Sequence, residues 1–360
     1  MEHTDTDFGL SRLLCEWYDT HKRDLPWRHS RDPYIIWISE IILQQTRVAQ
    51  GLDYFNRFVE RFPDIRSLAE ASEDEVLKYW QGLGYYSRAR NLHAAARFME
   101  THYEARFPQT YQEVRALKGI GDYTAAAIVS FAWNLPYAVV DGNVYRVLAR
   151  FFGIDTPIDT GAGKKYFAEL AQRLLPPKRA GLHNQAMMEL GALQCVPQTP
   201  NCTLCPLADA CVAYANETVS LLPVKQGRTK SRDRFFHYFY ILYKGKTFLQ
   251  KRVGKDIWKG LYEFPLIETN EACEWPELSR THEFERLFSG ISKLTWQSTS
   301  PLYKHVLSHQ TLYTTFYQLE INEAGELPHG FHMIPTEDLD QYAIPRLIQK
   351  YLDSLVGNMK

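Results

Sequence analysis

The sequence predicts an all-α domain followed by a smaller α+β domain. The chain has 360 residues, which is long for a single hydrophobic core. Apolar residues recur at helical spacing from residue 8 to about residue 215. From Phe235 onward the apolar period becomes two, which is typical of strands. We therefore expect a helical domain over 1–221, a linker over 222–233 and an α+β domain over 234–354.

The composition describes an ordinary globular protein, with 45% hydrophobic and 23% charged residues. The formal net charge of -1 decides little about nucleic acids, because affinity for phosphates depends on local patches. The sequence contains no apolar run of membrane-spanning length, and the opening "MEHTDTDFGL" lacks the core of a signal peptide. We predict a cytoplasmic monomer, nucleoid-associated if bacterial, with no membrane partner.

Helical periodicity in the first domain is interrupted by glycines and prolines, which separate the predicted helices. The segments with this periodicity are 33–62, 87–103, 123–133, 144–154 and 184–195.

Four of the six cysteines lie close together near the end of this domain, with the spacing C-x6-C-x2-C-x5-C. They are Cys195, Cys202, Cys205 and Cys211. In a reducing compartment, clustered cysteines bind metal or do redox chemistry more often than they form disulfides. Four thiolates suit zinc and an iron–sulfur cluster equally well, so the spacing alone leaves both open.

The second domain begins after a basic segment, "LPVKQGRTKSRDR", which we interpret as a solvated connector in preference to a strap on DNA. Residues 235–252 predict two strands around a tight turn, and 260–268 and 311–321 predict further strands. Helical periodicity returns in 274–291 and 343–355.

The segment "LKGIGDYTAAAI" (117–128) resembles a helix-hairpin-helix DNA-binding element. Gly119 and Gly121 permit a sharp turn that exposes backbone N–H groups at a helix N-terminus, where a phosphate can bind. An ordinary helix–helix turn is the alternative interpretation of these glycines.

Two acids are candidates for catalysis. Asp141, in "VVDGNVYRV", precedes a helix, where capping is the plain interpretation and where the helix N-terminus favours the ionised carboxylate. Glu40 lies in an apolar helical segment, "SEIILQQTRV", where a solvated edge is the plain interpretation. If Glu40 faces inward, burial raises its pKa and makes it a candidate general acid. One raised acid and one ionised acid suit cleavage of a glycosidic bond.

These motifs, taken in order with the cysteine spacing, resemble the endonuclease III superfamily of DNA glycosylases. The resemblance implies a helix-hairpin-helix glycosylase domain in which the four cysteines hold a [4Fe-4S] cluster. Cys15 and Cys273 lie outside the pattern and are expected only to pack.

Within that superfamily, bifunctional members carry a lysine two residues after the second hairpin glycine, and its amine attacks the sugar. Here that position is Tyr123. The stretches "LPWR", "SEIILQQTRV", "GLGYYSRARNLHAAA" and "NQAMMELGA" resemble the adenine DNA glycosylase branch. This implies a monofunctional DNA N-glycosylase of base excision repair. Its implied substrate is adenine opposite 8-oxoguanine or guanine in duplex DNA.

The resemblance also implies roles for individual residues. The catalytic set is Glu40 as acid, Asp141 at the sugar, and Tyr123 and Asn143 beside them. The adenine pocket is lined by Trp27, Arg28, Leu43 and Gln185. The DNA contacts are Gln45, Thr46, Tyr85, Gly119 and Gly121. Plain alternatives stay open, because Trp27 and Leu43 suit a core while Gln45 and Tyr85 suit a polar surface.

The second domain resembles the Nudix-fold domain of the same family through "FLQKRVGKDIWKGLYEFP" (248–265). The glutamate-rich box R-E-x-x-E-E of a working Nudix hydrolase is missing, which argues for recognition of 8-oxoguanine and against a pyrophosphatase. Ser308 and His309 are the implied contacts, with Leu307 where the family carries Phe. A polar turn between strands is the alternative.

Two further functions compete with adenine excision. One is a related glycosylase acting on another mismatch such as G:T, which Tyr123 does not exclude. The other is a non-catalytic iron–sulfur DNA sensor, which the presence of both Glu40 and Asp141 disfavours.

Overall fold

The protein is described by a computed structural model that covers residues 5–227, 231–323 and 325–357. Residues 228–230 of the predicted linker lie outside the described residues. The chain divides into two compact units. The first comprises Met1–Glu70 and Ala94–Gly227, and the second comprises Ala71–His93 and Arg228–Lys360. The domain limits expected from the sequence remain a prediction.

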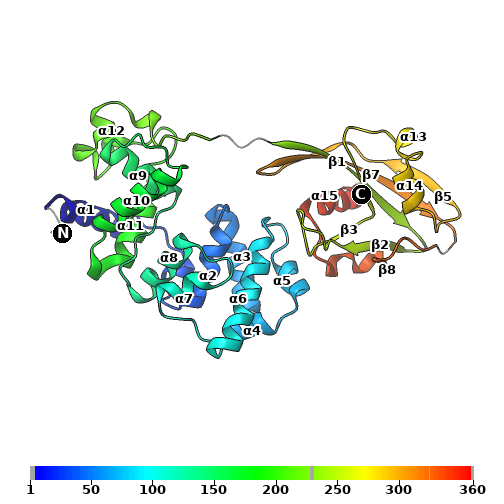
Figure 1. The fold of residues 1–360 in the computed structure, drawn as a ribbon, viewed down its shortest axis with the longest axis horizontal. Coiled ribbons are helices and arrows are strands. Elements are labelled where there is room, and N and C mark those ends of the chain that lie inside the picture. Colours follow the sequence, from blue (N-terminus) through cyan, green and yellow to red (C-terminus); the bar gives the residue numbers. More distant parts are fainter. Residues whose placement is uncertain (1–4, 228–230, 324, 358–360) are drawn as a thin grey trace. The chain divides into compact units, whose positions relative to one another are not determined.

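The first unit is helical, as predicted, and runs from blue to green in Figure 1. Its longer helices are α1 (Asp5–His21), α2 (Pro33–Leu43), α3 (Val48–Arg61), α4 (Ile65–Glu70), α6 (Ser87–Tyr103), α7 (Tyr111–Ala116), α8 (Asp122–Trp133), α9 (Gly142–Phe152), α10 (Gly161–Leu174) and α11 (Ala180–Leu193). Residues 87–93 at the start of α6 belong to the second unit. Short turns of helix complete it: η1 (Pro26–Arg28), η2 (Pro177–Arg179), η3 (Cys202–Leu204), η4 (Ala208–Ala210), α12 (Val212–Ala215) and η5 (Val219–Leu221).

Local sequence sets the ends of the helices that carry the candidate site. Helix α2 begins with Pro33 at its first position, and the Asp32 side chain accepts the Tyr34 N–H. Helix α9 begins at the Asp141 cap and ends at Gly153, whose φ of 66° is left-handed. Helix α2 packs on α8, and α11 packs on α1, α8 and α9, so the candidate residues on α2, α8, α9 and α11 meet.

The segment 33–62, expected as one helical run, is divided into α2 and α3. The break falls at 44–47, where Gln45 has a φ of 57°. A left-handed residue cannot continue a right-handed helix, which explains the interruption.

The second unit contains two sheets. Its strands are β1 (Arg232–Leu242), β2 (Lys246–Lys251), β3 (Tyr262–Glu263), β4 (Leu266–Thr269), β5 (Leu294–Thr299), β6 (Tyr303–Val306), β7 (Gln310–Ile321) and β8 (Phe331–Pro335). One sheet has the order β4-β1-β7-β5, with β6 also paired to β7, and the other has the order β3-β2-β8. Its helices are α5 (Glu73–Tyr79), α13 (Trp275–Leu278), α14 (His282–Leu287), η6 (Thr336–Gln341) and α15 (Arg346–Gly357).

Strand β1 explains why the larger sheet has helices on both faces. Its side chains alternate in direction, and both directions are apolar. Phe236 and Tyr238 pack in one core with Tyr351 of α15. Phe239 packs in a second core with Phe284 of α14. The α+β prediction is thereby confirmed, with helices covering each face.

The turn predicted between the first two strands is present, since Tyr243 and Lys246 bridge across Lys244 and Gly245. The two strands do not form an extended hairpin, however. Strand β1 pairs with β4 and, in parallel, with β7, whereas β2 pairs with β3 and β8. Turn chemistry is local, but the partner of each strand is chosen by long-range packing.

Residues 71–93 belong to the second unit through polar contacts with its C-terminal part. Asp74 accepts the Tyr262 hydroxyl at 2.9 Å. The Lys78 ammonium donates to the Tyr342 carbonyl at 3.2 Å, and the amide of Gln81 donates to Gln349 at 3.1 Å. Within the described residues, no helix is long and apolar enough to cross a membrane.

Candidate active site

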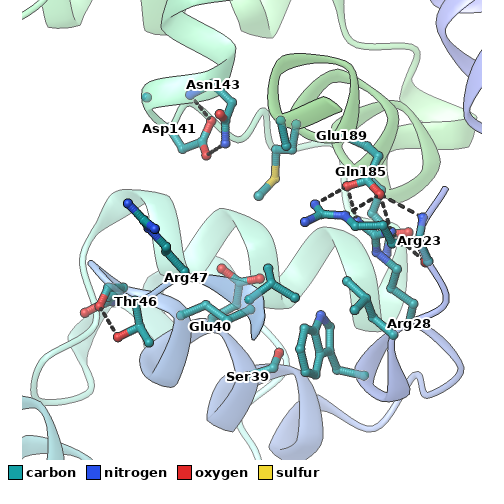
Figure 2. A pocket seen from close by; sticks show the side chains of 18 of the residues that line it. Arg23, Arg28, Ser39, Glu40, Thr46, Arg47, Asp141, Asn143, Gln185 and Glu189 are labelled. Atoms are coloured by element: carbon teal, nitrogen blue, oxygen red, sulfur yellow. Dashed lines mark hydrogen bonds and ion pairs between the residues drawn. The ribbon is translucent and has the colours of Figure 1, made fainter. Parts of the chain in front are cut away.

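A cavity of about 820 Å³ in the helical unit contains most of the predicted site residues. Its lining comes from η1, α2, the turn after α2, and the facing parts of α8, α9 and α11. Figure 2 shows Glu40 and Asp141 on opposite sides of this cavity, with Arg23, Arg28 and Glu189 at one end. The predicted catalytic residues Glu40, Tyr123, Asp141 and Asn143 all line it.

Glu40 faces inward from α2 and is only 8% exposed. Burial raises its pKa to about 7, against an opposing hydrogen bond from Tyr123. The Tyr123 hydroxyl donates to Glu40 Oε2 at 2.8 Å. Asp141 raises the pKa further, since a second carboxylate nearby disfavours another negative charge. A carboxyl group with a pKa near neutrality can hold a proton and release it to a substrate.

Asp141 caps α9 and also faces the cavity, so capping and a role in the site coexist. Its Oδ1 accepts the N–H groups of Asn143 and Val144 at 2.9 and 2.8 Å, and its Oδ2 accepts from the Asn143 amide at 2.8 Å. The expectation that the helix N-terminus favours the ionised carboxylate holds for these hydrogen bonds, which lower the pKa of Asp141. Burial outweighs these hydrogen bonds and raises the pKa of Asp141. Both oxygens nevertheless act only as acceptors in these bonds, as an ionised carboxylate does.

Glu189, on α11, organises one end of the cavity. It receives two hydrogen bonds from Arg28, at 2.9 and 2.7 Å, and two from the Arg23 side chain, at 2.9 and 2.5 Å. Burial alone would raise the pKa of Glu189, but hydrogen bonds from Arg28 and Arg23 hold it at about 2. The result is a fixed, charged wall that presents guanidinium N–H groups near the cavity.

The predicted pocket residues Trp27, Arg28, Leu43 and Gln185 all line the cavity. Trp27 is also buried against the edge of Phe55, with ring centroids 5.0 Å apart, so it belongs to the core as well. Gln185 accepts the Tyr18 hydroxyl at 2.6 Å, which fixes the orientation of its amide.

Two predicted DNA contacts have a strained backbone. Gln45 and Tyr85 have φ values of 57° and 48°, a region that residues other than glycine seldom adopt. Gln45 lines the cavity together with Thr46. Tyr85 is 48% exposed, so part of its ring is open to solvent. Backbone strain of this kind clusters at binding and catalytic sites.

Tyr85 also meets a residue from the far end of the sequence. Both Tyr85 and Ser308 belong to the second unit, and the Tyr85 hydroxyl lies 2.5 Å from Ser308 Oγ. Ser308 and His309 form the turn between β6 and β7. Two residues that the family resemblance implies as DNA contacts are therefore neighbours.

The predicted hairpin lies between α7 and α8. Gly119 has a φ of 83°, so a side chain there would be strained, and Gly121 is the N-cap of α8. No side chain caps α8 among the described residues. The hairpin interpretation requires that no side chain cap this helix, because a phosphate would take the place of the cap.

The four clustered cysteines line one small cavity together with Arg150. The buried Arg150 donates to Cys195 Sγ at 3.4 Å and to the carbonyls of Val196 and Pro197 at 2.8 and 3.0 Å. A guanidinium at this place would offset the negative charge of any thiolate among these four cysteines.

The model of the HhH-GPD superfamily of base excision DNA repair proteins matches residues 38–177, and the NUDIX domain model matches residues 237–354. An adenine DNA glycosylase of Buchnera aphidicola subsp. Baizongia pistaciae is 36% identical over 321 residues, which is 88% of each chain. The chain belongs to the adenine DNA glycosylase family. A mouse member of this family is 31% identical over 405 residues, which is 96% of this chain and 78% of the mouse protein.

Solved structures support the helical fold of this adenine DNA glycosylase family member. A thermostable thymine-DNA glycosylase has a TM-score of 0.54 and 29% identity, covering 58% of this chain and 97% of that one. An endonuclease III trapped covalently on DNA has a TM-score of 0.52 at 21% identity, covering 60% and 99%. The predicted family, the helix-hairpin-helix glycosylase domain and the Nudix-like domain are thus confirmed.

Sequence reasoning missed three residues of this adenine DNA glycosylase site: Arg23, Glu189 and Arg146. Glu189 carries the same signal as Glu40, an acid in an apolar helix, and could have been found by it. Arg146 donates to Asn143 Oδ1 at 2.8 Å and to the Cys195 carbonyl at 2.7 Å. It thereby connects the start of α9 with the cysteine loop, a link that no local pattern reveals.

Proposed function

We propose that the protein removes adenine from duplex DNA in which adenine is paired with 8-oxoguanine or guanine. The observation that carries the proposal is the buried Glu40, with a pKa near 7, held by Tyr123 and facing Asp141 across one cavity. The cavity is large enough for a flipped base, and a mispaired base costs least to unstack.

In the proposed reaction, Glu40 donates a proton to adenine N7, which turns the base into a better leaving group. Positive charge then develops on the sugar, and the Asp141 carboxylate stabilises it or bonds to it. Asn143 keeps Asp141 oriented through the 2.8 Å amide contact. Water completes the hydrolysis. Tyr123 has no amine, so strand cleavage through an imine is not part of the reaction.

Adenine recognition is assigned to the walls of the cavity. Trp27 and Leu43 supply apolar surface, and Gln185 supplies one amide. Arg28 is held rigid by Glu189, so it can donate without further ordering. An apolar wall with a few fixed polar groups suits a purine base.

Recognition of 8-oxoguanine is assigned to Ser308, His309, Tyr85 and Gln45. 8-Oxoguanine has an added acceptor at O8 and a donor at N7, and a hydroxyl can serve either atom. The contact between Tyr85 and Ser308 supports a shared role.

A double-mutant cycle of Tyr85→Phe and Ser308→Ala tests this shared role. The quantity measured is the ratio of the excision rates on 8-oxoguanine:adenine and guanine:adenine duplexes. We expect each change to shrink the ratio and the two effects to be non-additive. Additive effects would contradict a shared role.

We propose that Cys195, Cys202, Cys205 and Cys211 hold a [4Fe-4S] cluster. The four side chains line one small cavity together with the buried Arg150, and four thiolates suit such a cluster. The match to the HhH-GPD superfamily model supports the cluster in preference to a zinc ion. When bound, the cluster would cross-link the segment that ends the helical unit. We further propose that the protein is a cytoplasmic monomer.

Excision of thymine from G:T is the competing function, favoured by the likeness to a thymine-DNA glycosylase. Duplexes with adenine opposite 8-oxoguanine, guanine or thymine, and with thymine opposite guanine, separate the two. Free adenine from the first two alone supports our proposal, and thymine release supports the competitor.

A further inference from the structure

Asp122, an acidic residue, lies at the N-terminus of α8, where the hairpin is expected to bind an anion. Asp122 is the first residue of α8, directly after Gly121. The uncapped N–H groups and the dipole of a helix N-terminus favour a phosphate. A free carboxylate beside them repels the same phosphate. Asp122 therefore opposes the binding that the rest of the hairpin promotes.

Two side chains of α7 engage this carboxylate. Arg115 Nε is hydrogen-bonded to Asp122 Oδ1, and the Tyr111 hydroxyl donates to the same oxygen at 3.2 Å. The Tyr111 ring is itself stacked on Tyr137, with centroids 4.3 Å apart and planes 7° apart. Arg115 and Asp122 are 53% and 73% exposed. The bond from Arg115 lowers the pKa of Asp122, so its carboxylate is ionised at neutral pH and forms an ion pair with Arg115.

We propose that Arg115 is a positioning residue for DNA binding, which neutralises Asp122 and holds it, together with Tyr111, in a fixed place at the hairpin. The ligand concerned is a backbone phosphate of duplex DNA, bound by the α8 N-terminus without regard to base sequence. This inference rests on the proposed function of the hairpin. Arg115 acts through Asp122 and not by contacting the phosphate itself.

A purely structural clamp between α7 and α8 is the competing explanation. An exposed ion pair contributes little to the stability of a fold. The clamp explanation therefore predicts small effects of removing Arg115, on stability and on DNA affinity alike. Our proposal predicts an effect on DNA affinity that disappears when the Asp122 charge is also removed.

The test compares the full-length protein with Arg115→Ala, Asp122→Asn and the double variant. Binding to one duplex is measured by fluorescence anisotropy at low salt, and thermal unfolding is measured in parallel. We expect Arg115→Ala to raise the Kd about two- to fivefold, the scale of one unscreened charge a few ångströms from a phosphate. Asp122→Asn should bind as well as the native protein or better, and the double variant should match Asp122→Asn. Arg12→Ala, in the exposed pair with Glu16 on α1, is the matched control and should change nothing.

The double variant decides between the explanations. If it binds as weakly as Arg115→Ala, Arg115 contacts the phosphate directly and the proposal is overturned. Gly119→Ala separates failure of this inference from failure of the hairpin assignment, because its positive φ strains any side chain. If Gly119→Ala weakens binding and Arg115→Ala does not, the role of Arg115 is wrong and the hairpin assignment stands. If neither weakens binding, both are wrong.

Discussion

Tyr123 donates its hydroxyl hydrogen to Glu40 Oε2 at 2.8 Å, across 83 positions of sequence. The bond joins α8, which follows the hairpin, to α2, which forms the floor of the cavity in Figure 2. It fixes the carboxyl group while burial keeps its pKa near 7. Tyr123, which occupies the position of the lysine in bifunctional relatives, therefore helps to hold the Glu40 carboxyl group in place.

Excision should depend on the proton of Glu40. Because this pKa lies at about 7, the single-turnover rate is expected to fall as pH rises through 7. Glu40→Gln and Asp141→Asn keep shape, and each should slow adenine release at least about a hundredfold. Glu16→Gln, an exposed acid on α1, is the control. A normal rate in either variant would show that its residue has another role.

Because Glu40 is buried, its ionisation at high pH should lower the free energy of unfolding. Its folded pKa of about 7 exceeds the ordinary value of 4.5, so the folded state resists ionisation between these pH values. Glu40 therefore leaves the free energy of unfolding unchanged below about pH 4.5 and lowers it as pH rises toward 7. Glu40→Gln should therefore stabilise the protein by about 3 kcal/mol at pH 8 and by less than about 1 kcal/mol at pH 5. Urea unfolding at both pH values measures this, and an equal change at both would refute it.

No imine should form between the protein and the sugar. Tyr123 lacks an amine, so borohydride added during the reaction is expected to trap little protein on DNA. Tyr123→Lys is expected to trap more, because an amine then stands beside Glu40 in the cavity. Efficient trapping by the native protein would show that a lysine elsewhere in the chain attacks the sugar. Lys118 of the hairpin would then be the first lysine to substitute.

Glu189 should contribute to the free energy of unfolding as well as to the arrangement of side chains at the cavity. Glu189→Gln leaves the guanidinium groups of Arg23 and Arg28 without their carboxylate, and breaking such a buried pair costs about 3–5 kcal/mol. Because the pKa of Glu189 is lowered to about 2, its contribution to the free energy of unfolding is fully present above about pH 4.5. This contribution is lost as pH falls toward 2. Glu169→Gln, in an exposed pair on α10, should change stability little. Equal losses from both variants would contradict the role of Glu189.

The cysteine loop should carry iron. Protein purified after growth with iron should contain four irons per chain, as the cluster type requires. Cys202→Ala should lose iron and fold poorly, whereas Cys273→Ala, outside the cluster of cysteines, should retain iron. Stoichiometric zinc without iron would refute the assignment.

Much of the site could be predicted because its signals are local. Glycines mark the hairpin, Asp141 marks a helix start, and Glu40 stands out as an acid among apolar residues. The partners of these residues could not be predicted, since they depend on packing between distant segments. Arg23 reaches Glu189 across 166 positions, and Tyr85 reaches Ser308 across 223. The pairing of β1 with β7 was missed for the same reason. The opposing effects of burial and capping on Asp141 also required coordinates.

The most direct test of the account is single-turnover release of free base by the intact protein from four duplexes. These carry adenine opposite 8-oxoguanine, guanine or thymine, and thymine opposite guanine. We expect adenine release from the first two, fastest with 8-oxoguanine, and at least about a hundredfold loss of this release with Glu40→Gln. Release of thymine from the G:T duplex, or undiminished adenine release by Glu40→Gln, would contradict it.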